Sequence, residues 1–487
     1  MVGNYIYGFF IVMILFSSQL KSEESLDEAE ILKEQGNNFL YGKSGENVDI
    51  DKGIQLLKDA FQLGSSSAAL ILANEYLNGG QVENNCIEGL MYANQAKDSE
   101  PSAYALLAQE YDLGRCVPHN KALSISFLRK GVDSNDPTSI TLLGVWYFFG
   151  INVEKNDKES FDLFSRAAKL GDCVGQNYLG TMYENGVHVK IDLKQAFEIY
   201  SKSVSEGCGE SLKSIGYFYY SGKAVKQNFE EAYSYFHRAM QRGDVEAKAR
   251  VATSLLTGTG VKKNINLGIE LLIEAAKQGD SGSQYILSVE YYNGKNIEEN
   301  LEKSRYWAEQ SALQTDSWGQ SWLGFHFEFG YGGDLDLIKA EELYKQSMNQ
   351  ATFSKERLAA WYTEGKFYTK DHTAARLILE SALKHSDDEI VAQLGELLSC
   401  SSNDDVRDAN RAQKFIEERI KDRLSYTVKL KLALAASYSE QSNFDGALDV
   451  METIETSELL EIYSEEETKL RFHDRIELYK NYQPCRF

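Results

Sequence analysis

The histidines, which are the side chains most often used for acid–base catalysis and metal binding, are scattered along the sequence without a catalytic spacing. No pair of them has the His-Glu-x-x-His arrangement, and neither a Gly-x-Ser-x-Gly motif nor a P-loop is present. Asp49-Ile50-Asp51 lacks the glycine and the terminal glutamate of an EF-hand loop. The pair Gly258 and Gly260 lacks the third glycine of a dinucleotide-binding loop. The sequence therefore predicts no enzyme, no cofactor and no metal site.

The cysteines offer a different chemistry, because an oxidising compartment would allow them to form disulfides. Cys86 and Cys116 fall in loops of neighbouring predicted repeats and could pair, and Cys173 and Cys208 could pair in the same way. Buried free thiols are the alternative for all six cysteines, which include Cys400 and Cys485. No Cys-x-x-Cys pair or zinc-binding spacing occurs.

Aromatic side chains are the best candidates for recognition. Trp146 and Phe218 each precede a tyrosine that we assign to a buried column, and a step of one residue turns about 100° around a helix. We therefore expect both side chains to point outward. The candidate protein-binding residues are Trp146, Phe148, Phe218, Tyr220, Tyr292 and Phe325. An exposed aromatic strip would indicate a protein-binding site, and packing between neighbouring helices is the alternative.

The composition excludes several classes of protein. The chain has 487 residues and a net charge of −22, so it has no electrostatic footprint for nucleic acid or for an anionic membrane surface. Only 4 prolines stand beside 29 tyrosines and 23 phenylalanines, which argues against a disordered chain. A charged fraction of 25% and a hydrophobic fraction of 43% are typical of a globular protein.

The amino-terminal residues 1–22 are predicted to be an export signal. An apolar core runs from Ile6 to Phe16 and is too short for a membrane-spanning helix, which needs about 20 residues. Cleavage is expected near Ser22, and an uncleaved anchor is the alternative. No later stretch is long and apolar enough to predict a membrane span in the mature chain. The chain is therefore expected to be exported from the cytosol.

A repeat of about 36 residues determines the predicted fold. Nine glycines recur at steps of 35 or 36 residues, and each follows an aromatic or leucine residue by three, a small residue by six and an aliphatic residue by seven. Offsets of three and four place these columns on one face of a helix that the glycine ends. The glycines are Gly79, Gly114, Gly150, Gly186, Gly222, Gly258, Gly294, Gly330 and Gly365.

A second helix is predicted after each glycine, because the residues ten and seventeen positions later are small and share a face. Each repeat is thus an αα-hairpin, and stacked hairpins give an all-α solenoid. The predicted organisation is an export signal over 1–22, a capping hairpin over 23–66, nine repeats over 67–386, degenerate tetratricopeptide-like repeats over 387–456 and an acidic segment over 457–487.

Two repeats carry a recognisable family pattern. One has Asn177-Tyr-Leu-Gly-Thr-Met-Tyr-Glu-Asn-Gly186-Val followed by Asp192-Leu-Lys-Gln-Ala196, and another has Gly258-Thr-Gly260-Val261. These residues resemble the Sel-one-like repeat family, a relative of the tetratricopeptide repeat. The resemblance implies a solenoid that binds other proteins.

The late repeat around Ser354 to Tyr368, with Ala374 and Ala375 after it, is similar to an atypical repeat of the Sel-one-L branch of ubiquitin-ligase adaptors. That branch implies an adaptor in endoplasmic-reticulum-associated degradation, located in the lumen of the endoplasmic reticulum. Its partners would be the membrane component of a ubiquitin ligase, misfolded lumenal proteins and lectin-type receptors. The alternative location is outside the cell, if the protein is secreted. The alternatives are a secreted repeat protein unrelated to degradation and a hydrolase-type enzyme, for which no nucleophile constellation is found.

Overall fold

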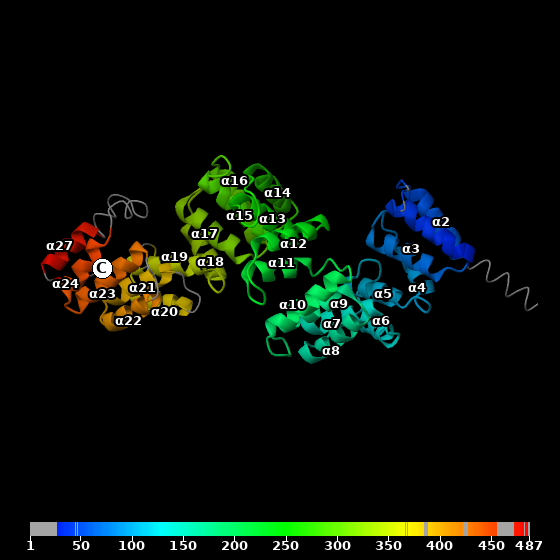
Figure 1. Cartoon of the computed structure of the whole chain (residues 1–487), viewed down its shortest axis with the longest axis horizontal. Coiled ribbons are helices and arrows are strands. Elements are labelled where there is room, and N and C mark those ends of the chain that lie inside the picture. The colour runs from blue at the N-terminus through cyan, green and yellow to red at the C-terminus, as the bar shows by residue number, and fades with distance from the viewer. Residues whose placement is uncertain are drawn as a thin grey trace, which may run out of the picture. The chain divides into compact units, whose positions relative to one another are not determined.

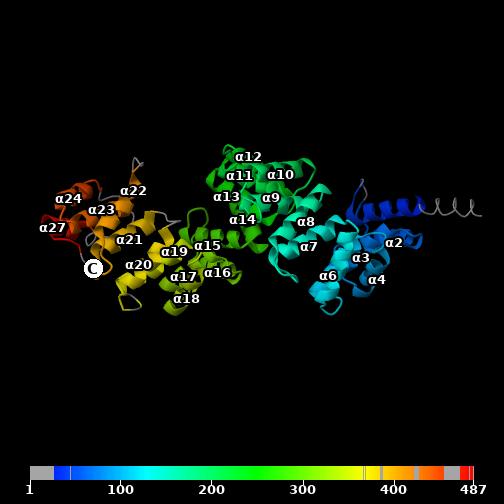
Figure 2. The ribbon, with the colours of Figure 1, turned by 90° about the horizontal axis from the view of Figure 1, so that it is seen from below.

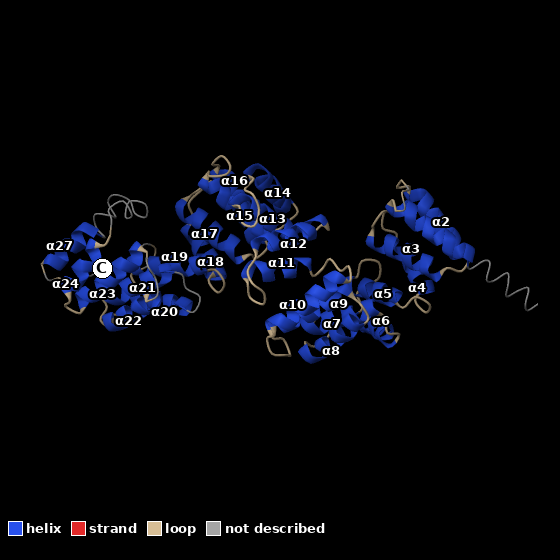
Figure 3. Cartoon of the chain, viewed as in Figure 1, coloured by secondary structure: helices blue, strands red, loops and turns tan. Residues whose placement is uncertain are grey.

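The computed structural model describes residues 27–43, 45, 47–365, 367, 369–383, 388–421, 427–454, 472–481 and 483–485. Every regular element in these ranges is helical (Figure 3). The predicted export signal lies outside the described residues, as does much of the predicted acidic segment. None of the described helices has both the length and the apolar character needed to cross a membrane. The chain divides into two compact units, Met1–Arg242 and Gly243–Phe487, which we call unit 1 and unit 2.

Unit 1 begins with a helix over residues 27–41 and continues as a series of antiparallel hairpins (Figure 1). Its further helices are α2 (Ile50–Gln62), α3 (Ser66–Asn78), α4 (Cys86–Ala96), α5 (Ser102–Leu113), α6 (Lys121–Asp133), α7 (Pro137–Phe149), α8 (Asp157–Lys169), α9 (Cys173–Asn185), α10 (Leu193–Ser205), α11 (Leu212–Ser221) and α12 (Phe229–Gln241).

Unit 2 continues the same hairpins and adds two more beyond the predicted 36-residue repeats (Figure 2). Its helices are α13 (Val245–Thr257), α14 (Ile265–Lys277), α15 (Ser281–Asn293), α16 (Leu301–Leu313), α17 (Ser317–Phe329), α18 (Leu337–Ser347), α19 (Thr352–Glu364), α20 (His372–Ala382), α21 (Asp388–Cys400), α22 (Ala409–Ile420), α23 (Val428–Glu440), α24 (Phe444–Glu452) and α27 (Asp474–Lys480). The predicted all-α array of stacked hairpins is confirmed.

Each hairpin of the nine predicted repeats turns at the glycine that the repeat predicts. All nine glycines follow the last residue of a first helix and have φ between 62° and 81°, the left-handed conformation that ends a helix. Six residues later an asparagine or aspartate caps the second helix, as Asn156 does for α8 and Asp192 does for α10. All nine repeats have an asparagine or aspartate at this position, but the sequence interpretation did not use it to predict where the second helix begins.

The small residue six positions before each capping glycine lets the two helices of a hairpin pack closely. A Cβ atom on Gly180 would lie 2.4 Å from the ring of Tyr200, and one on Gly144 would lie 2.8 Å from the ring of Phe164. Both rings are fully buried. At these two positions the small residue therefore leaves room for a large aromatic side chain from the second helix.

Disulfides join neighbouring repeats in unit 1. Cys86 at the start of α4 pairs with Cys116 in the loop after α5, and Cys173 at the start of α9 pairs with Cys208 in the loop before α11. Both are the pairings that the sequence made possible, and the described residues contain no free cysteine. The alternative of buried free thiols is wrong.

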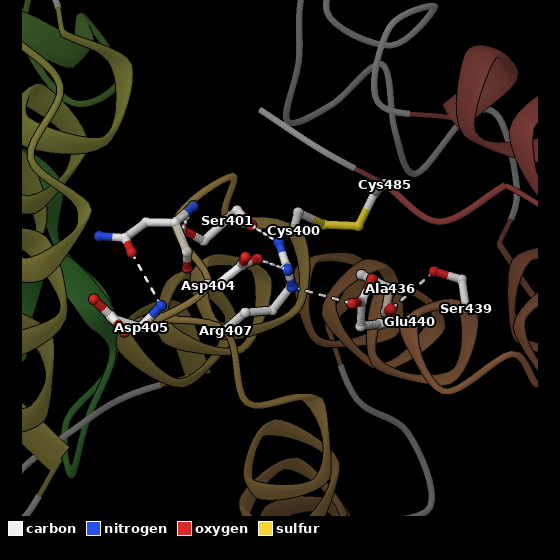
Figure 4. A network of polar contacts seen from close by, with 10 residues as sticks. Cys400, Ser401, Asp404, Asp405, Arg407, Ala436, Ser439, Glu440 and Cys485 are labelled. Atoms are coloured by element: carbon white, nitrogen blue, oxygen red, sulfur yellow. Dashed lines mark hydrogen bonds and ion pairs between the residues drawn. A yellow bond between two sulfur atoms is a disulfide. The ribbon is translucent and has the colours of Figure 1, made fainter.

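A third disulfide, which the sequence interpretation missed, fixes the end of unit 2. Cys485 pairs with Cys400 at the end of α21, where both pack against Ala436 of α23 (Figure 4). Beside it, the Arg407 guanidinium donates to the Ser401 carbonyl at 2.7 Å and lies 3.1 Å from a carboxylate oxygen of Glu440. The disulfide and this ion pair thus join α21, the loop after it and α23.

Candidate protein-binding surface

Two of the six predicted binding residues lie in the core. Trp146 on α7 is only 2% exposed and Phe218 on α11 only 3% exposed, so the expectation that they point outward is wrong. Both lie three residues after a buried aliphatic residue, Leu143 or Ile215. Three residues turn 300°, which is about 60° short of a full turn, so these side chains stay on the buried face. The tyrosines that follow them lie on the other flank of the same face and are half-buried against it.

The two remaining candidates of unit 1 belong to separate small groups. Phe148 is half-buried, and its ring lies 4.9 Å from that of Phe149 and 6.0 Å from that of Tyr178 on α9. Tyr220 is 46% exposed and lies edge-on to Phe229 at 5.4 Å. Unit 1 therefore has exposed aromatic residues, but its four candidates do not form one strip.

Tyr292 and Phe325, the two candidates of unit 2, lie together in a much larger aromatic cluster. Their ring centroids are 5.6 Å apart, and Trp322 lies 5.2 Å from Tyr292 and 4.9 Å from Phe325. Burial and a hydrogen bond with Tyr331 raise the pKa of Tyr292 to about 12, so its hydroxyl stays neutral. We define the aromatic cluster as Tyr285, Tyr292, Trp318, Trp322, Phe325, Phe329, Tyr331 and Phe353.

One side of the aromatic cluster opens into a pocket of about 240 Å³ between three successive first helices. Tyr285 comes from α15, Trp318 and Trp322 from α17, and Phe353 and Glu356 from α19. Ser321 and Thr352 complete the lining, and we call this site the aromatic pocket. Trp318 at its edge is 47% exposed, so part of the wall is directly accessible.

A buried polar network around Glu328 holds α17 against α18 and α19. The Glu328 carboxylate accepts hydrogen bonds from Arg357 Nε at 2.9 Å, from the Trp361 indole at 2.8 Å and from the Tyr344 hydroxyl at 2.8 Å. Burial alone would raise the pKa of Glu328, but these donors, Arg357 foremost, lower it below its usual value. Glu328 is therefore ionised, and it binds side chains from both neighbouring helices.

His326 fixes the other side of α17. Its Nδ1 lies 3.0 Å from the Tyr331 carbonyl, and its Nε2 lies 3.0 Å from the Ser304 hydroxyl of α16. Burial lowers the pKa of His326 to about 4, and the Arg305 guanidinium contributes to the decrease. The imidazole is neutral at pH 7, and its two contacts identify it as a structural residue of the core.

Among the described residues, one group of possible ligand side chains lies close enough together to share a metal ion, and it consists of Cys173, Cys208 and Glu210. Both sulfurs of this group belong to one disulfide, so neither is available as a thiolate ligand.

The sequence interpretation overlooked Trp318 and Trp322, which both line the aromatic pocket and of which Trp318 is exposed. A usable pattern was present, because Trp318, Trp322, Phe325 and Phe329 follow one another at spacings of four, three and four residues. This spacing places all four on one stripe of a helix. Trp318 and Trp322 were overlooked because they lie farther along the sequence from the capping glycine than the aromatic residues chosen in other repeats.

The hairpin period, the capping glycines and the accessible aromatic cluster define an all-α repeat protein with a surface suited to binding. The sequence profile of the Sel1 repeat matches ten segments, and the chain belongs to the Sel1 repeat family. The matched residues are 36–65, 66–99, 101–136, 137–172, 174–208, 210–244, 245–280, 281–316, 319–350 and 354–387. Sel1 repeat proteins act as protein-interaction scaffolds.

Two of the solved structures to which the chain is similar are bacterial proteins. A protective antigen of uropathogenic Escherichia coli with an SLR fold is 22% identical, with a TM-score of 0.49, and the match covers 89% of this chain and 97% of that one. A Sel1 repeat protein from Oxalobacter formigenes is 27% identical, with a TM-score of 0.44, and the match covers 50% of this chain and 98% of that one. No curated protein matches the chain.

Proposed function

We propose that this Sel1 repeat chain is a non-enzymatic scaffold that binds proteins in the lumen of the endoplasmic reticulum. Its role there would be to present misfolded clients to a membrane-embedded ubiquitin ligase. The observation that carries the choice of compartment is the pairing of all six cysteines in three disulfides. Structural disulfides form and persist in oxidising compartments and are rare in the cytosol.

The apolar core from Ile6 to Phe16 supports the same compartment, because it has the length of an export signal. The absence of a catalytic histidine spacing supports a binding role, and the aromatic pocket supplies an accessible surface for it. A secreted Sel1 repeat protein without a link to degradation is the second candidate, which the disulfides favour equally.

The test is to express the full chain with a carboxyl-terminal tag in eukaryotic cells and to follow its fate. We expect a mature protein that begins near Glu23, has no alkylatable thiol and stays with endoplasmic-reticulum markers. A chain that begins at Glu23, without residues 1–22, is the matched control and should remain cytosolic and reduced. A full chain that stays cytosolic with Met1 or Val2 at its start would contradict the proposal.

Retention separates the two candidates. An adaptor of degradation should remain in the cells, co-purify with a ubiquitin-ligase membrane component and slow the removal of a misfolded lumenal reporter when it is depleted. A secreted scaffold should accumulate in the medium, and its depletion should leave the reporter unchanged.

A further inference from the structure

We propose that the aromatic pocket binds the side chain of an arginine from a partner protein. This proposal rests on the proposed function only in that the partner is a protein. It adds which side chain of that partner the pocket recognises. It is carried by the arrangement of the four rings, by the size of the pocket and by the charge around it.

The rings form walls at angles to one another. Tyr285 lies 6.2 Å from Trp318 with an interplanar angle of 38°, and 6.4 Å from Trp322 with an angle of 89°. Phe353 closes the other side, 6.3 Å from Trp322 at 51°. Aromatic faces that converge in this way attract a cation placed within about 6 Å of a ring centroid. Tryptophan, which supplies two of the four rings, is the most favourable residue for this interaction.

The size of the pocket suits one side chain. Its volume of about 240 Å³ lies below the roughly 300–1,000 Å³ of pockets for small organic ligands. The pocket is also open at Trp318, so a polypeptide can pass over it while one residue enters.

The charge around the pocket is negative. Glu356 lines it, and none of the described lysine and arginine residues does. Asp316 lies close enough to Tyr285 to act with burial in raising the pKa of that phenol. A cation entering the pocket would therefore meet carboxylates and π faces.

Arginine fits these walls better than lysine. Its guanidinium is planar, stacks on aromatic faces and remains less strongly hydrated than an ammonium group. It can also pair with a carboxylate such as that of Glu356 through two parallel N–H groups. Lysine offers a compact, strongly hydrated charge, which gains less from a set of flat rings.

The decisive experiment titrates the full chain with a capped glycine–serine peptide that carries one central arginine, in parallel with peptides carrying lysine, citrulline or norleucine. We expect the arginine peptide to bind with a dissociation constant on the order of 1 mM, as suits a single anchor residue. Citrulline has the shape of arginine without its charge and should bind at least about tenfold more weakly. Equal binding of arginine, citrulline and norleucine, or no binding of arginine, would overturn the proposal. Equal or tighter binding of lysine would overturn the assignment to arginine.

Variants then locate the site. Trp318→Ala and Glu356→Gln should each weaken arginine binding by about tenfold, whereas Tyr306→Ala should leave it unchanged. Tyr306 is a matched control because it is an exposed aromatic residue of α16 outside the pocket. Binding that survives both pocket variants would place the arginine elsewhere and contradict the proposal. Thermal melting of each variant accompanies the titrations, and the citrulline comparison in the unmodified chain decides the chemistry if Trp318→Ala unfolds.

The outcome is independent of the compartment. The peptide titrations use purified oxidised protein, so they retain their meaning if the chain proves to be secreted. Conversely, a chain that works in the endoplasmic reticulum without arginine binding would refute the pocket proposal and leave the scaffold proposal intact.

Discussion

Helices α7 and α17 occupy the same place in their repeats, and both are rich in aromatic residues, yet they use them differently. In α7 the residue four positions before the capping glycine is Trp146, which is buried in the core of unit 1. In α17 that position holds His326, and the aromatic residues Trp318 and Trp322 lie at the pocket of unit 2 instead. The register of an aromatic residue relative to the capping glycine therefore decides whether it is part of the core or of the surface.

The first prediction tests the core side of this comparison. Trp146→Ala should lower the free energy of unfolding of unit 1 by about 3–5 kcal/mol, because it removes a large, fully packed side chain. Phe149→Ala in the same helix is the control and should cost no more than about 1 kcal/mol, since Phe149 is 58% exposed. Chemical denaturation followed by hydrogen exchange in α7 and α8 measures both. Equal losses for the two variants would remove the distinction between the two registers.

The second prediction concerns the polar network around Glu328 in unit 2. Glu328→Gln should destabilise unit 2 by about 3 kcal/mol, because it leaves the half-buried Arg357 without its carboxylate partner. Since the pKa of Glu328 is lowered by folding, its contribution is present above the ordinary glutamate pKa and is lost as the pH falls through the folded value. Denaturation at pH 7 and at pH 3, with the exposed Glu342→Gln as the control, should show a variant effect at pH 7 that shrinks at pH 3.

The sequence predicted those features of the structure that recur from one repeat to the next. The glycine, small-residue and aliphatic columns recur in all nine repeats, so they predict the hairpins correctly. Cys86 and Cys116 stand in neighbouring repeats and could be paired by that logic, whereas Cys400 and Cys485 lie 85 residues apart with no shared period. The third disulfide requires Cys485 to lie beside the end of α21, and the 36-residue period contains no information about that contact.

The candidate site was predicted only in part, for a related reason. Tyr292 and Phe325 lie in the aromatic cluster but do not line the aromatic pocket. Trp318 and Trp322, which do line it, are peculiar to one helix and therefore belong to no column. Trp146 and Phe218 were misplaced because their orientation was judged from one neighbouring tyrosine, without the aliphatic residue three positions before. A binding site in a repeat protein is made of departures from the repeat, so an argument from the columns cannot find it.

The third prediction concerns His326, which occupies in α17 the repeat position that Trp146 occupies in α7. Folding lowers the pKa of His326 from 6.5 to about 4. Between these values the unfolded chain binds a proton that the folded chain does not, so stability declines as the pH falls through this window and is fully present above it. The loss amounts to at most about 3 kcal/mol, since one pKa unit corresponds to about 1.4 kcal/mol.

Denaturation of unit 2 across this pH range is the measurement, with His326→Gln compared with the unmodified chain. The variant should show a shallower pH dependence between pH 6.5 and 4, although it is less stable at pH 7. His119→Gln, at an exposed histidine in unit 1, should leave the dependence unaltered. An unchanged slope in His326→Gln would mean that the imidazole is protonated in the folded chain.

The smallest expected effect compares two phenylalanines in one register, Phe149 at the end of α7 and Phe329 at the end of α17. Both are exposed and both pack on another aromatic ring, Phe148 or Phe325, at 4.9 Å. Phe329 also has the Arg357 guanidinium 5.4 Å from its ring centroid, a cation–π contact that the structure gives Phe329 through the Glu328 network. Phe329→Leu should therefore cost about 0.5–1 kcal/mol more than Phe149→Leu, which loses only its aromatic contacts. Denaturation of the two variants gives the difference, and equal costs would mean that Arg357 contributes to unit 2 through Glu328 alone.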